Sequence, residues 1–308
     1  MILSIIIPVG KDPIGLTETL ESYQQMPSSD KNGVEVIVVI DGPYDEVESV
    51  ANRYHGVKAL KLQKNGGSYH ARNKGAERAT GERLAFIDAG VEFKVDWLQK
   101  AINHSSEAEY LAGNVLHPSP KGGSVELYQL LFEFQIAEHF ENLKFCPTAN
   151  LIVTRKLFLE SGGFEERLRS SGDREFGSRV LDAGTTASLD LARIVYHPFR
   201  SLKGLLKKKL RISMGYRNLS MLYPERFPPD RVVNLLKMAF PPKTYALLNP
   251  LTKWSRIHEL EKEYNLHFNY AQQVSCYLLL YLTKLTVLWG RLIQYRSSDS
   301  FEWSNQKS

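Results

Sequence analysis

The sequence predicts an α/β fold, in which a mixed, mainly parallel sheet is flanked by helices and followed by a mainly helical extension. Over the first hundred residues, short β-branched apolar runs alternate with segments of helical periodicity, the pattern of parallel strands joined by right-handed crossovers. Beyond residue 200 the apolar residues keep a helical spacing, and this part is basic and aromatic. We therefore expect two domains, 1–200 and 201–308.

The strands expected in the first part are short runs with near-continuous apolarity, as in strands covered on both faces. They lie at 3–9 (LSIIIPV), 34–40 (VEVIVVI), 57–62 and 83–88 (RLAFID). Helices are expected between them at 15–26 and 68–79. In the first helix, Leu16, Leu20 and Tyr23 recur at helical spacing.

The second part of the expected sheet continues with strands at 110–118 and 151–154 and an apolar strand that ends near residue 197. The expected helices lie at 124–140, 173–183, 203–223 and about 255–295. Five prolines make 224–242 a punctuated linker.

Composition places the chain among globular proteins, because 43% of its 308 residues are hydrophobic and 24% are charged. The net charge of +5 is unevenly placed, and much of the excess comes from the run KGLLKKKLR at 203–211. Such a run is either a solvated helix face or a site for an anionic partner, such as a diphosphate or a lipid headgroup. We expect no nucleic-acid partner.

The two cysteines, Cys146 and Cys276, are far apart and have no metal-binding spacing. This pattern suits a reducing compartment, so we expect a cytoplasmic protein. The apolar start MILSIIIPVG lacks a basic leader and is read as a first strand. The run 274–290 is interrupted by Lys284 and is short for a membrane span. It is expected to be a packed helix or, alternatively, a helix at the inner membrane surface, which would give peripheral membrane contact.

Two aspartates follow strands of the expected sheet. Asp41 comes after the second strand and Asp88 after the fourth, and each precedes small residues. The first strand ends nearby with Pro8 and Val9. Ligands of such sheets bind beyond the carboxyl ends of the strands. A single aspartate there is often only a turn residue; two at equivalent ends favour a ligand site.

Two nucleotide-binding loops are absent from the sequence, because it contains neither G-x-G-x-x-G nor G-x-x-x-x-G-K-[ST]. The segment NGGSYHARNKG at 65–75 is the alternative candidate. Gly66 and Gly67 allow a tight turn, and Arg72 and Lys74 lie in the helix that follows. A helix start with nearby cations can hold a diphosphate or the polar edge of a base.

Five segments in order identify a family. They are SIIIPV, VIVVIDG, NGGSYHARNKGAERATGERLAFIDAG, DWL and ANLIVTRKLFLESGGFEERLRSSGDREFGSRVLDAG. Together they resemble the family 2 glycosyltransferases of the GT-A fold, whose sheet is Rossmann-like, over roughly residues 2–200.

This resemblance implies an inverting transferase that moves a sugar from a nucleotide-diphosphate donor, UDP more than GDP, to a saccharide or lipid-linked acceptor. It implies that Pro8 and Val9 border the nucleobase, that Asp41 contacts the base or ribose, and that Arg72 helps to hold the nucleotide. Asp88 would be the first acid of the D-x-D motif, which presents a divalent cation, Mn²⁺ or Mg²⁺.

The same resemblance places Asp173 where the general base belongs, with Arg174 and Glu175 beside it as contacts to the acceptor or diphosphate. Inverting transfer needs one carboxylate at the acceptor hydroxyl and positive charge at the departing diphosphate. Lys208 and Arg211 in the basic run are further candidates for that charge. The alternative for Asp173 is a plain helix cap, with Glu175 in the first turn.

Two glycines depart from the family pattern. Gly90 stands where D-x-D has its second acid, and Gly172 stands where the family has a glutamate before the base. A lone Asp88 can still serve, because Mg²⁺ sites use one or two carboxylates with phosphates and water. His197 is a candidate further metal ligand, and Glu92 is a weaker one. Both glycines also leave an alternative: a catalytically silent, glycosyltransferase-like binding module.

Overall fold

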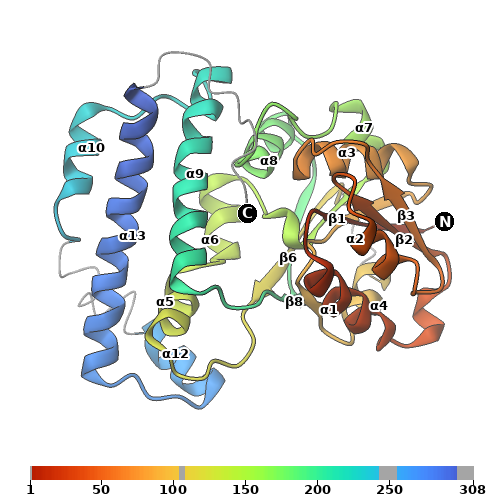
Figure 1. Ribbon diagram of the computed structural model, residues 1–308, viewed down its shortest axis with the longest axis horizontal. Helices are drawn as coiled ribbons and strands as arrows, with labels where there is room; N and C mark the ends of the chain where they lie inside the picture. Colours follow the sequence, from red (N-terminus) through yellow and green to blue (C-terminus); the bar gives the residue numbers. More distant parts are fainter. Residues whose placement is uncertain (1, 104–107, 243–254, 297–308) are drawn as a thin grey trace. The chain divides into compact units, whose positions relative to one another are not determined.

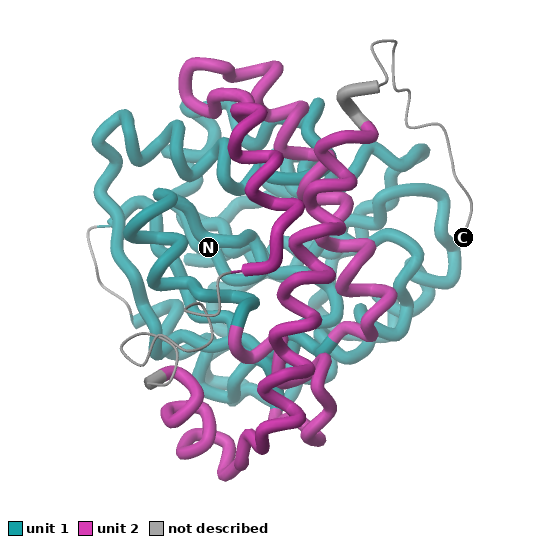
Figure 2. The backbone as a smooth tube through the Cα atoms, turned by 90° about the vertical axis from the view of Figure 1, so that its left-hand side faces the viewer, with its two compact units in different colours: residues 1–118, 132–199 teal, residues 119–131, 200–308 magenta. Residues whose placement is uncertain are grey.

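The computed structural model describes residues 2–103, 108–242 and 255–296. Trp254, one of the aromatic residues of the C-terminal part, lies outside them. The chain forms two compact units, which Figure 2 shows in different colours. The sheet unit comprises residues 1–118 and 132–199, and the helical unit comprises residues 119–131 and 200–308. The helical unit thus includes a short segment from the middle of the chain.

The sheet unit contains an eight-stranded sheet in the order β3-β2-β1-β4-β7-β6-β8-β5. Its strands are β1 (Leu3–Val9), β2 (Val34–Ile40), β3 (Val57–Lys61), β4 (Arg83–Phe86), β5 (Glu92–Phe93), β6 (Tyr110–Leu116), β7 (Leu151–Thr154) and β8 (Ala187–Tyr196). This mixed, mainly parallel sheet with flanking helices confirms the predicted fold class.

Strand direction brings most of the carboxyl ends together. β1, β2, β3 and β4 pair in parallel. β7 is antiparallel to both β4 and β6, so β6 again runs with β4, and β8 is parallel to β6. Only β7 and β5 of the described strands run the other way. The ends of β1, β2, β4, β6 and β8 therefore share one edge, which we call the carboxyl edge.

Helices cover this sheet. They are α1 (Pro13–Gln24), α2 (Asp45–Ala51), α3 (Ser68–Arg78), α4 (Trp97–Asn103), α6 (Ile136–Leu143), α7 (Arg155–Glu160) and α8 (Gly172–Asp182), with 3-10 turns η1 (Ser28–Lys31) and η2 (Thr148–Asn150). Helix α3 packs closely on β1 because residue 75 is a glycine. A Cβ on Gly75 would lie 2.5 Å from Cγ2 of Ile6. All of β1 is buried, as its unbroken apolar run predicts.

An aromatic core fixes α7 and α8 to the sheet. Phe158 from α7 and Phe164 from the following loop each lie 5.0 Å from Phe86 of β4, measured between ring centroids. Phe176 from α8 lies 5.0 Å from Phe164, and Tyr69 of α3 lies 5.5 Å from it. The start of α8 is thereby held against the start of α3.

Several expected elements differ from the structure. The helix expected at 124–140 is broken into α5 (Ser124–Phe132) and α6, because Phe134 adopts a φ of 50°. The segment expected at 255–295 is broken likewise into α12 (Ser255–Tyr264) and α13 (Tyr270–Arg296), with Asn265 at a φ of 51°. The expected linker 224–242 contains a helix, α10 (Val232–Ala239).

The helical unit is built around α9 (Leu202–Leu222) and α13, which run alongside each other (Figure 1). Gly290 allows the close approach, since a Cβ there would lie 2.9 Å from the Cβ of Ser213. The Ser213 hydroxyl donates to the Val287 carbonyl at 2.6 Å. Tyr128 of α5 and Thr283 of α13 share a hydrogen bond of 2.9 Å. Both cysteines are buried and free.

Helix α13 is longer than the apolar run that marks it in the sequence. The stretch Tyr270–Ile293 has the length and composition of a membrane-crossing helix, with a mean hydropathy of 1.3 in its most apolar part. The expectation that this segment is too short to span is therefore wrong by length. The shorter estimate came from the break that Lys284 makes in the sequence pattern.

Candidate functional site

Asp41 holds the glycine loop that precedes α3. Its two carboxylate oxygens accept hydrogen bonds from the backbone N–H groups of Gly66 at 2.7 Å and Gly67 at 2.8 Å. The Asn65 side chain donates to the Asp41 carbonyl at 3.0 Å. Asp41 is buried, and Gly67 has a φ of 95°, which favours glycine. The sequence expectation of a tight turn here is met, and Asp41 is the residue that fixes it.

Arg72 and Asp88 form an ion pair at the carboxyl edge, through Nη2 of the guanidinium and Oδ1 of the carboxylate. Arg72 is buried, whereas the side chain of Asp88 is 37% exposed. Within the described residues, Nε of Arg72 is buried without a partner, and no donor reaches Oδ2 of Asp88. The pair therefore keeps both a cationic and an anionic group with capacity to bind.

Asp173 lies in the first turn of α8 and is connected to this pair through Tyr69. The Tyr69 hydroxyl donates to Oδ1 of Asp173 at 3.3 Å, and the Arg72 guanidinium lies 5.6 Å from the centre of the Tyr69 ring. The backbone N–H of Arg174 also donates to Oδ1, at 2.9 Å. The described residues place no hydrogen-bond donor on Oδ2.

The pKa of Asp173 is raised above its usual range. Burial is the main cause, and the negative charge of Asp88 adds to it. The N–H of Arg174, the charge of Arg72 and the hydroxyl of Tyr69 act in the opposite direction and stabilise the carboxylate. A carboxylate with a raised pKa is a better proton acceptor than an exposed one.

Gly172 is where the ring of Tyr69 packs against α8. A Cβ on Gly172 would lie 2.7 Å from Cε2 and 2.8 Å from Cδ2 of that ring. The departure from the family pattern at this position thus has a physical reason: the aromatic ring occupies the space that a glutamate side chain would enter.

The departure from the family pattern at Gly90 is explained by its backbone conformation. Its φ is 89°, and its N–H donates to the Gly15 carbonyl at 3.0 Å and to the Thr19 hydroxyl at 2.9 Å. The loop after β4 is docked on α1 by these bonds. In the described part of the chain, no group of three or more His, Cys, Asp or Glu side chains is arranged to hold a metal ion.

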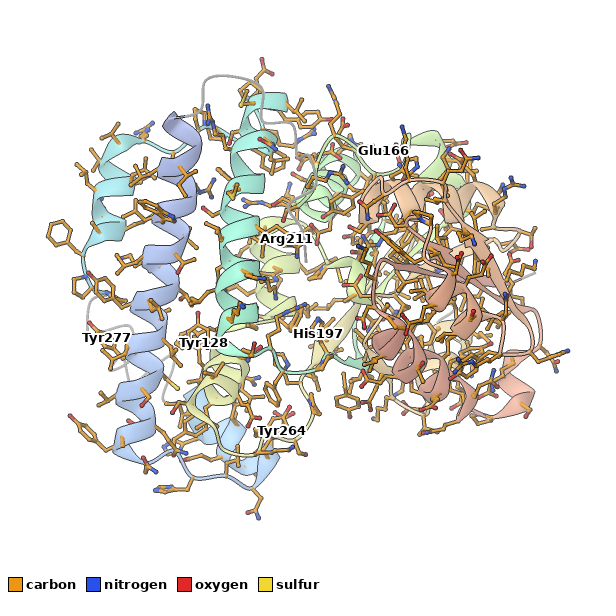
Figure 3. The ribbon with its side chains drawn as sticks, viewed as in Figure 1. Tyr128, Glu166, His197, Arg211, Tyr264 and Tyr277 are labelled. Atoms are coloured by element: carbon orange, nitrogen blue, oxygen red, sulfur yellow. The ribbon has the colours of Figure 1, made fainter. Side chains whose placement is uncertain are left out.

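His197 lies at the carboxyl edge, one residue beyond β8 (Figure 3). Its Nδ1 lies 2.8 Å from the Pro198 carbonyl, so this nitrogen donates to that oxygen. His117, one residue beyond β6, donates from Nδ1 to the His197 carbonyl at 2.8 Å. The ring of Phe134 lies 5.0 Å from that of His197. A metal-ligand role for His197 stays a prediction.

The other expected site residues are placed in three ways. Pro8 and Val9 are buried and pair with Val39 and Ile40, and their role at the nucleobase stays a prediction. Arg174 follows Asp173 in α8 and is partly exposed. Lys208 and Arg211 lie on α9 of the helical unit, where Figure 3 labels Arg211, and their role at a diphosphate stays a prediction.

Glu175 has a structural role instead. Its side chain is 0% exposed, and its two oxygens accept hydrogen bonds from Nε and Nη2 of Arg179 at 2.7 and 3.0 Å. The same guanidinium donates to the Gly163 carbonyl at 2.7 Å. Glu175 therefore anchors α8 to the loop before it and is removed from the proposed substrate contacts.

Two residues near the site were not identified from the sequence. Tyr69 stands in the 65–75 segment but has no family role that would mark it. Arg169 lies four residues before Asp173, and its Nη1 is 2.5 Å from the place that a Cβ on Gly67 would take. The arginine in LRSSGD was the available signal, since a cation this close to the glycine loop suits a diphosphate.

Comparison with known proteins gives a family match. The family model described as Glycosyl transferase family 2 matches residues 4–164. Glycosyltransferase AglE of Haloferax volcanii is 30% identical over 227 residues, which cover 71% of this chain and 74% of that protein. The pre-mycofactocin glycosyltransferase of Mycobacterium tuberculosis is 23% identical over 74% of this chain and 49% of its own. The glucosyl-dolichyl phosphate glucuronosyltransferase of H. volcanii is 27% identical over 46% of this chain and 49% of its own.

Solved structures agree on the fold. A mannosyltransferase from Pyrobaculum calidifontis, in complex with GDP-Man and Mn²⁺, has a TM-score of 0.63 at 15% identity and covers 96% of this chain and 88% of its own. TarS of S. aureus in complex with UDP-GlcNAc has a TM-score of 0.53 at 17% identity, covering 98% and 93%. The family model, the curated relative and the fold lead to one conclusion: the chain belongs to glycosyltransferase family 2 and is a glycosyltransferase.

Proposed function

We propose that this enzyme transfers a sugar with inversion from a nucleotide-diphosphate donor to a saccharide or lipid-linked acceptor. UDP-sugars are the preferred donors in this proposal. The observation that carries the proposal is the placement of Asp173. Its carboxylate has a raised pKa and is linked through Tyr69 to Arg72, the partner of Asp88. One carboxylate able to take a proton thus lies beside one cation able to hold a phosphate.

Asp173 is the general base of this proposal. Tyr69 and the Arg174 N–H hold Oδ1, so Oδ2 is the oxygen that removes the proton from the acceptor hydroxyl as it attacks the anomeric carbon. The bond from that carbon to the diphosphate breaks as the new glycosidic bond forms. The proton stays on Asp173 until solvent takes it.

The departing diphosphate needs positive charge, and Arg72 is a buried cation whose charge acts on the base. Oxygen ligands suit Mg²⁺ and Mn²⁺, and Asp88 offers one unshared carboxylate oxygen, so the residues fit a cation held jointly with phosphate oxygens and water. Asp88 would hold it, with His197 as the candidate further ligand. When bound, it would neutralise charge on the diphosphate.

Similar proteins support the proposed classes of donor and acceptor. One structural neighbour was solved with UDP-GlcNAc and another with GDP-Man, which supports a nucleotide-sugar donor. One relative is named for a dolichyl phosphate-linked substrate, which supports a lipid-linked acceptor. A cytoplasmic location, expected from the two free cysteines, is part of the same proposal.

A thermal-shift panel tests the donor site. The protein is melted with UDP, GDP, CDP or dTDP, each with Mn²⁺, Mg²⁺ or EDTA, because a ligand that binds the folded state raises the Tm by mass action. We expect the largest rise with UDP and a divalent cation. A rise that EDTA leaves unchanged would place the diphosphate on arginines alone. A panel with no rise would favour the catalytically silent module.

A further inference from the structure

The helical unit exposes large apolar side chains on two neighbouring helices. On α10, Val232 and Leu236 are four residues apart and are 67% and 60% exposed, and Phe240, which follows the end of the helix, is 68% exposed. Residues four apart lie on the same face of a helix. Only Leu235 of the described α10 residues is buried. Helix α10 is thus an amphipathic helix whose broad apolar side faces outward.

Helix α13 continues this pattern. Its buried residues Cys276, Thr283 and Gly290 repeat every seven positions and face α5 and α9. On the opposite side, Leu278, Leu282 and Trp289 are 59%, 39% and 61% exposed. Since α10 packs against α13, we treat Val232, Leu236, Phe240, Leu278, Leu282 and Trp289 together as the apolar face.

The polar side chains of α13 beside this face are used within the unit. Tyr281 donates to the Ala239 carbonyl at 2.8 Å (Figure 3 shows Tyr277 on the same helix). Tyr277 donates to the Pro242 carbonyl at 2.8 Å, and Lys284 donates to the carbonyls of Lys237 and Phe240 at 2.9 and 2.8 Å. These bonds satisfy the end of α10, whose last carbonyls have no partner within the helix. The Lys284 charge that interrupts the apolar run therefore points to α10.

Charge separates sharply between the two units. The helical unit contains 19 lysines and arginines against 8 aspartates and glutamates, a formal net charge of +11. The sheet unit contains 20 against 26, a net charge of −6. The excess is present beside the apolar face, where Arg231, which precedes α10, and Lys237 of α10 are exposed. A surface that is both apolar and cationic complements an anionic bilayer.

We propose that the apolar face docks the enzyme on the surface of an anionic membrane, with α10 and α13 lying in the headgroup region. The proposal deepens the proposed function, because it supplies the surface on which a lipid-linked acceptor would be met. The neighbouring helix α9 indicates that α13 lies on the membrane and does not cross it. That helix packs along α13 and carries Lys203, Lys207, Lys208, Lys209, Arg211 and Arg217, which hydrocarbon would not accommodate.

Vesicle co-sedimentation tests the proposal without donor or acceptor, so its outcome does not depend on the proposed chemistry. The full chain is mixed with vesicles of phosphatidylcholine alone or of phosphatidylcholine with phosphatidylglycerol, at low and high salt. We expect binding to the anionic vesicles and a loss of most of it at high salt. The variant L236Q/F240Q and the variant L278Q/W289Q should each bind at least tenfold more weakly. R231Q/K237Q should lose only the preference for anionic lipid.

The matched control is V95Q/L191Q, which removes two apolar side chains of the sheet unit that are 59% and 46% exposed. It should bind as the unchanged protein does. All variants alter exposed positions, and unchanged thermal melts show that they fold. Three results would overturn the proposal: no binding, equal loss in the control, or protein that stays with the membrane after high-salt and carbonate washing. The last result would mean that α13 crosses the bilayer.

Discussion

The ring of Tyr69 fills the space beside Gly172, so close that a Cβ on the glycine would lie 2.7 Å from the ring. The hydroxyl of the same ring reaches Asp173, the next residue, at 3.3 Å. One side chain of α3 therefore both requires a glycine at the start of α8 and orients the carboxylate that follows. The missing glutamate and the proposed base are two aspects of one packing arrangement.

Replacing Tyr69 by phenylalanine should keep the ring and remove the hydrogen bond. The hydroxyl lowers the pKa of Asp173, so its loss should raise that pKa further. Since the base works only when deprotonated, the acid limb of kcat/KM should move to higher pH. The loss of one hydrogen bond, about 1 kcal/mol, predicts a roughly fivefold lower kcat/KM on that limb. A pH–rate profile measures this, with the exposed Tyr270→Phe as control. An unmoved limb would refute the positioning role.

Restoring a glutamate at residue 172 should be harmful in this chain. Gly172→Glu must displace the Tyr69 ring, and overpacking of this kind costs about 1–3 kcal/mol. Combining Gly172→Glu with Tyr69→Ser removes the ring from this space. The double variant should therefore lose less free energy of unfolding than the sum of the two single variants. Denaturant unfolding of the four proteins gives the interaction free energy. Additive losses would show that the two positions do not compete for space.

Asp173→Asn should abolish transfer while leaving the donor site intact. Loss of a general base typically costs 10²–10⁴-fold in rate, roughly the fall expected in kcat. The free energy of unfolding should be unchanged or higher, because burial disfavours the charge that the change removes. Turnover and the Tm rise with UDP are measured side by side. Near-normal turnover would assign the base to another residue.

Gly90→Asp should not build a second metal ligand. The position has open space for a side chain, but its φ of 89° would strain any residue other than glycine by about 1–2 kcal/mol. We expect a lower Tm and no greater stabilisation by Mn²⁺. Gly10→Asp is the matched control, because it also has open space and no positive φ. Stronger Mn²⁺ stabilisation in Gly90→Asp alone would contradict this view of the loop.

Glu35, far from the site, should control acid stability. Burial alone would raise its pKa, but hydrogen bonds from Lys58, Ser4 and Thr80 lower it to about 2. Since the folded pKa lies below the unfolded one, the carboxylate stabilises the fold above about pH 4.5, and this stability is lost as the pH falls toward 2. Glu35→Gln should lower the unfolding free energy by about 3 kcal/mol at neutral pH and flatten its acid dependence. Urea titrations at several pH values measure this, with the exposed Glu46→Gln as control.

The fold could be predicted from the sequence wherever a helix or strand has a matching hydrophobic pattern. The runs at 3–9 and 34–40 are buried on both faces and appear as β1 and β2. The short β5 and the start of β8, which has no buried residue before Arg193, have no such run. The break at Phe134 lacks the glycine that usually marks a positive φ. Helix α10 is hidden between prolines, which predict a linker.

The carboxylates of the candidate site could be predicted from the sequence, but the contacts between its side chains could not. Strand-end position alone indicated Asp41 and Asp88, and the family pattern indicated Asp173. The part played by Tyr69 depends on a contact across 104 residues, which no local pattern records. Glu175 was misjudged because a carboxylate beside a base resembles a ligand, and only the structure shows its bonds to Arg179.

The ion pair of Arg72 and Asp88 makes the donor and its cation mutually dependent. A diphosphate that engages Arg72 and a cation that engages the unshared oxygen of Asp88 each compete with the charge of this contact. The ligand that binds first weakens the contact and so lowers the cost of binding for the other. Their binding should therefore be cooperative, and by thermodynamic reciprocity each should raise the affinity for the other by the same factor.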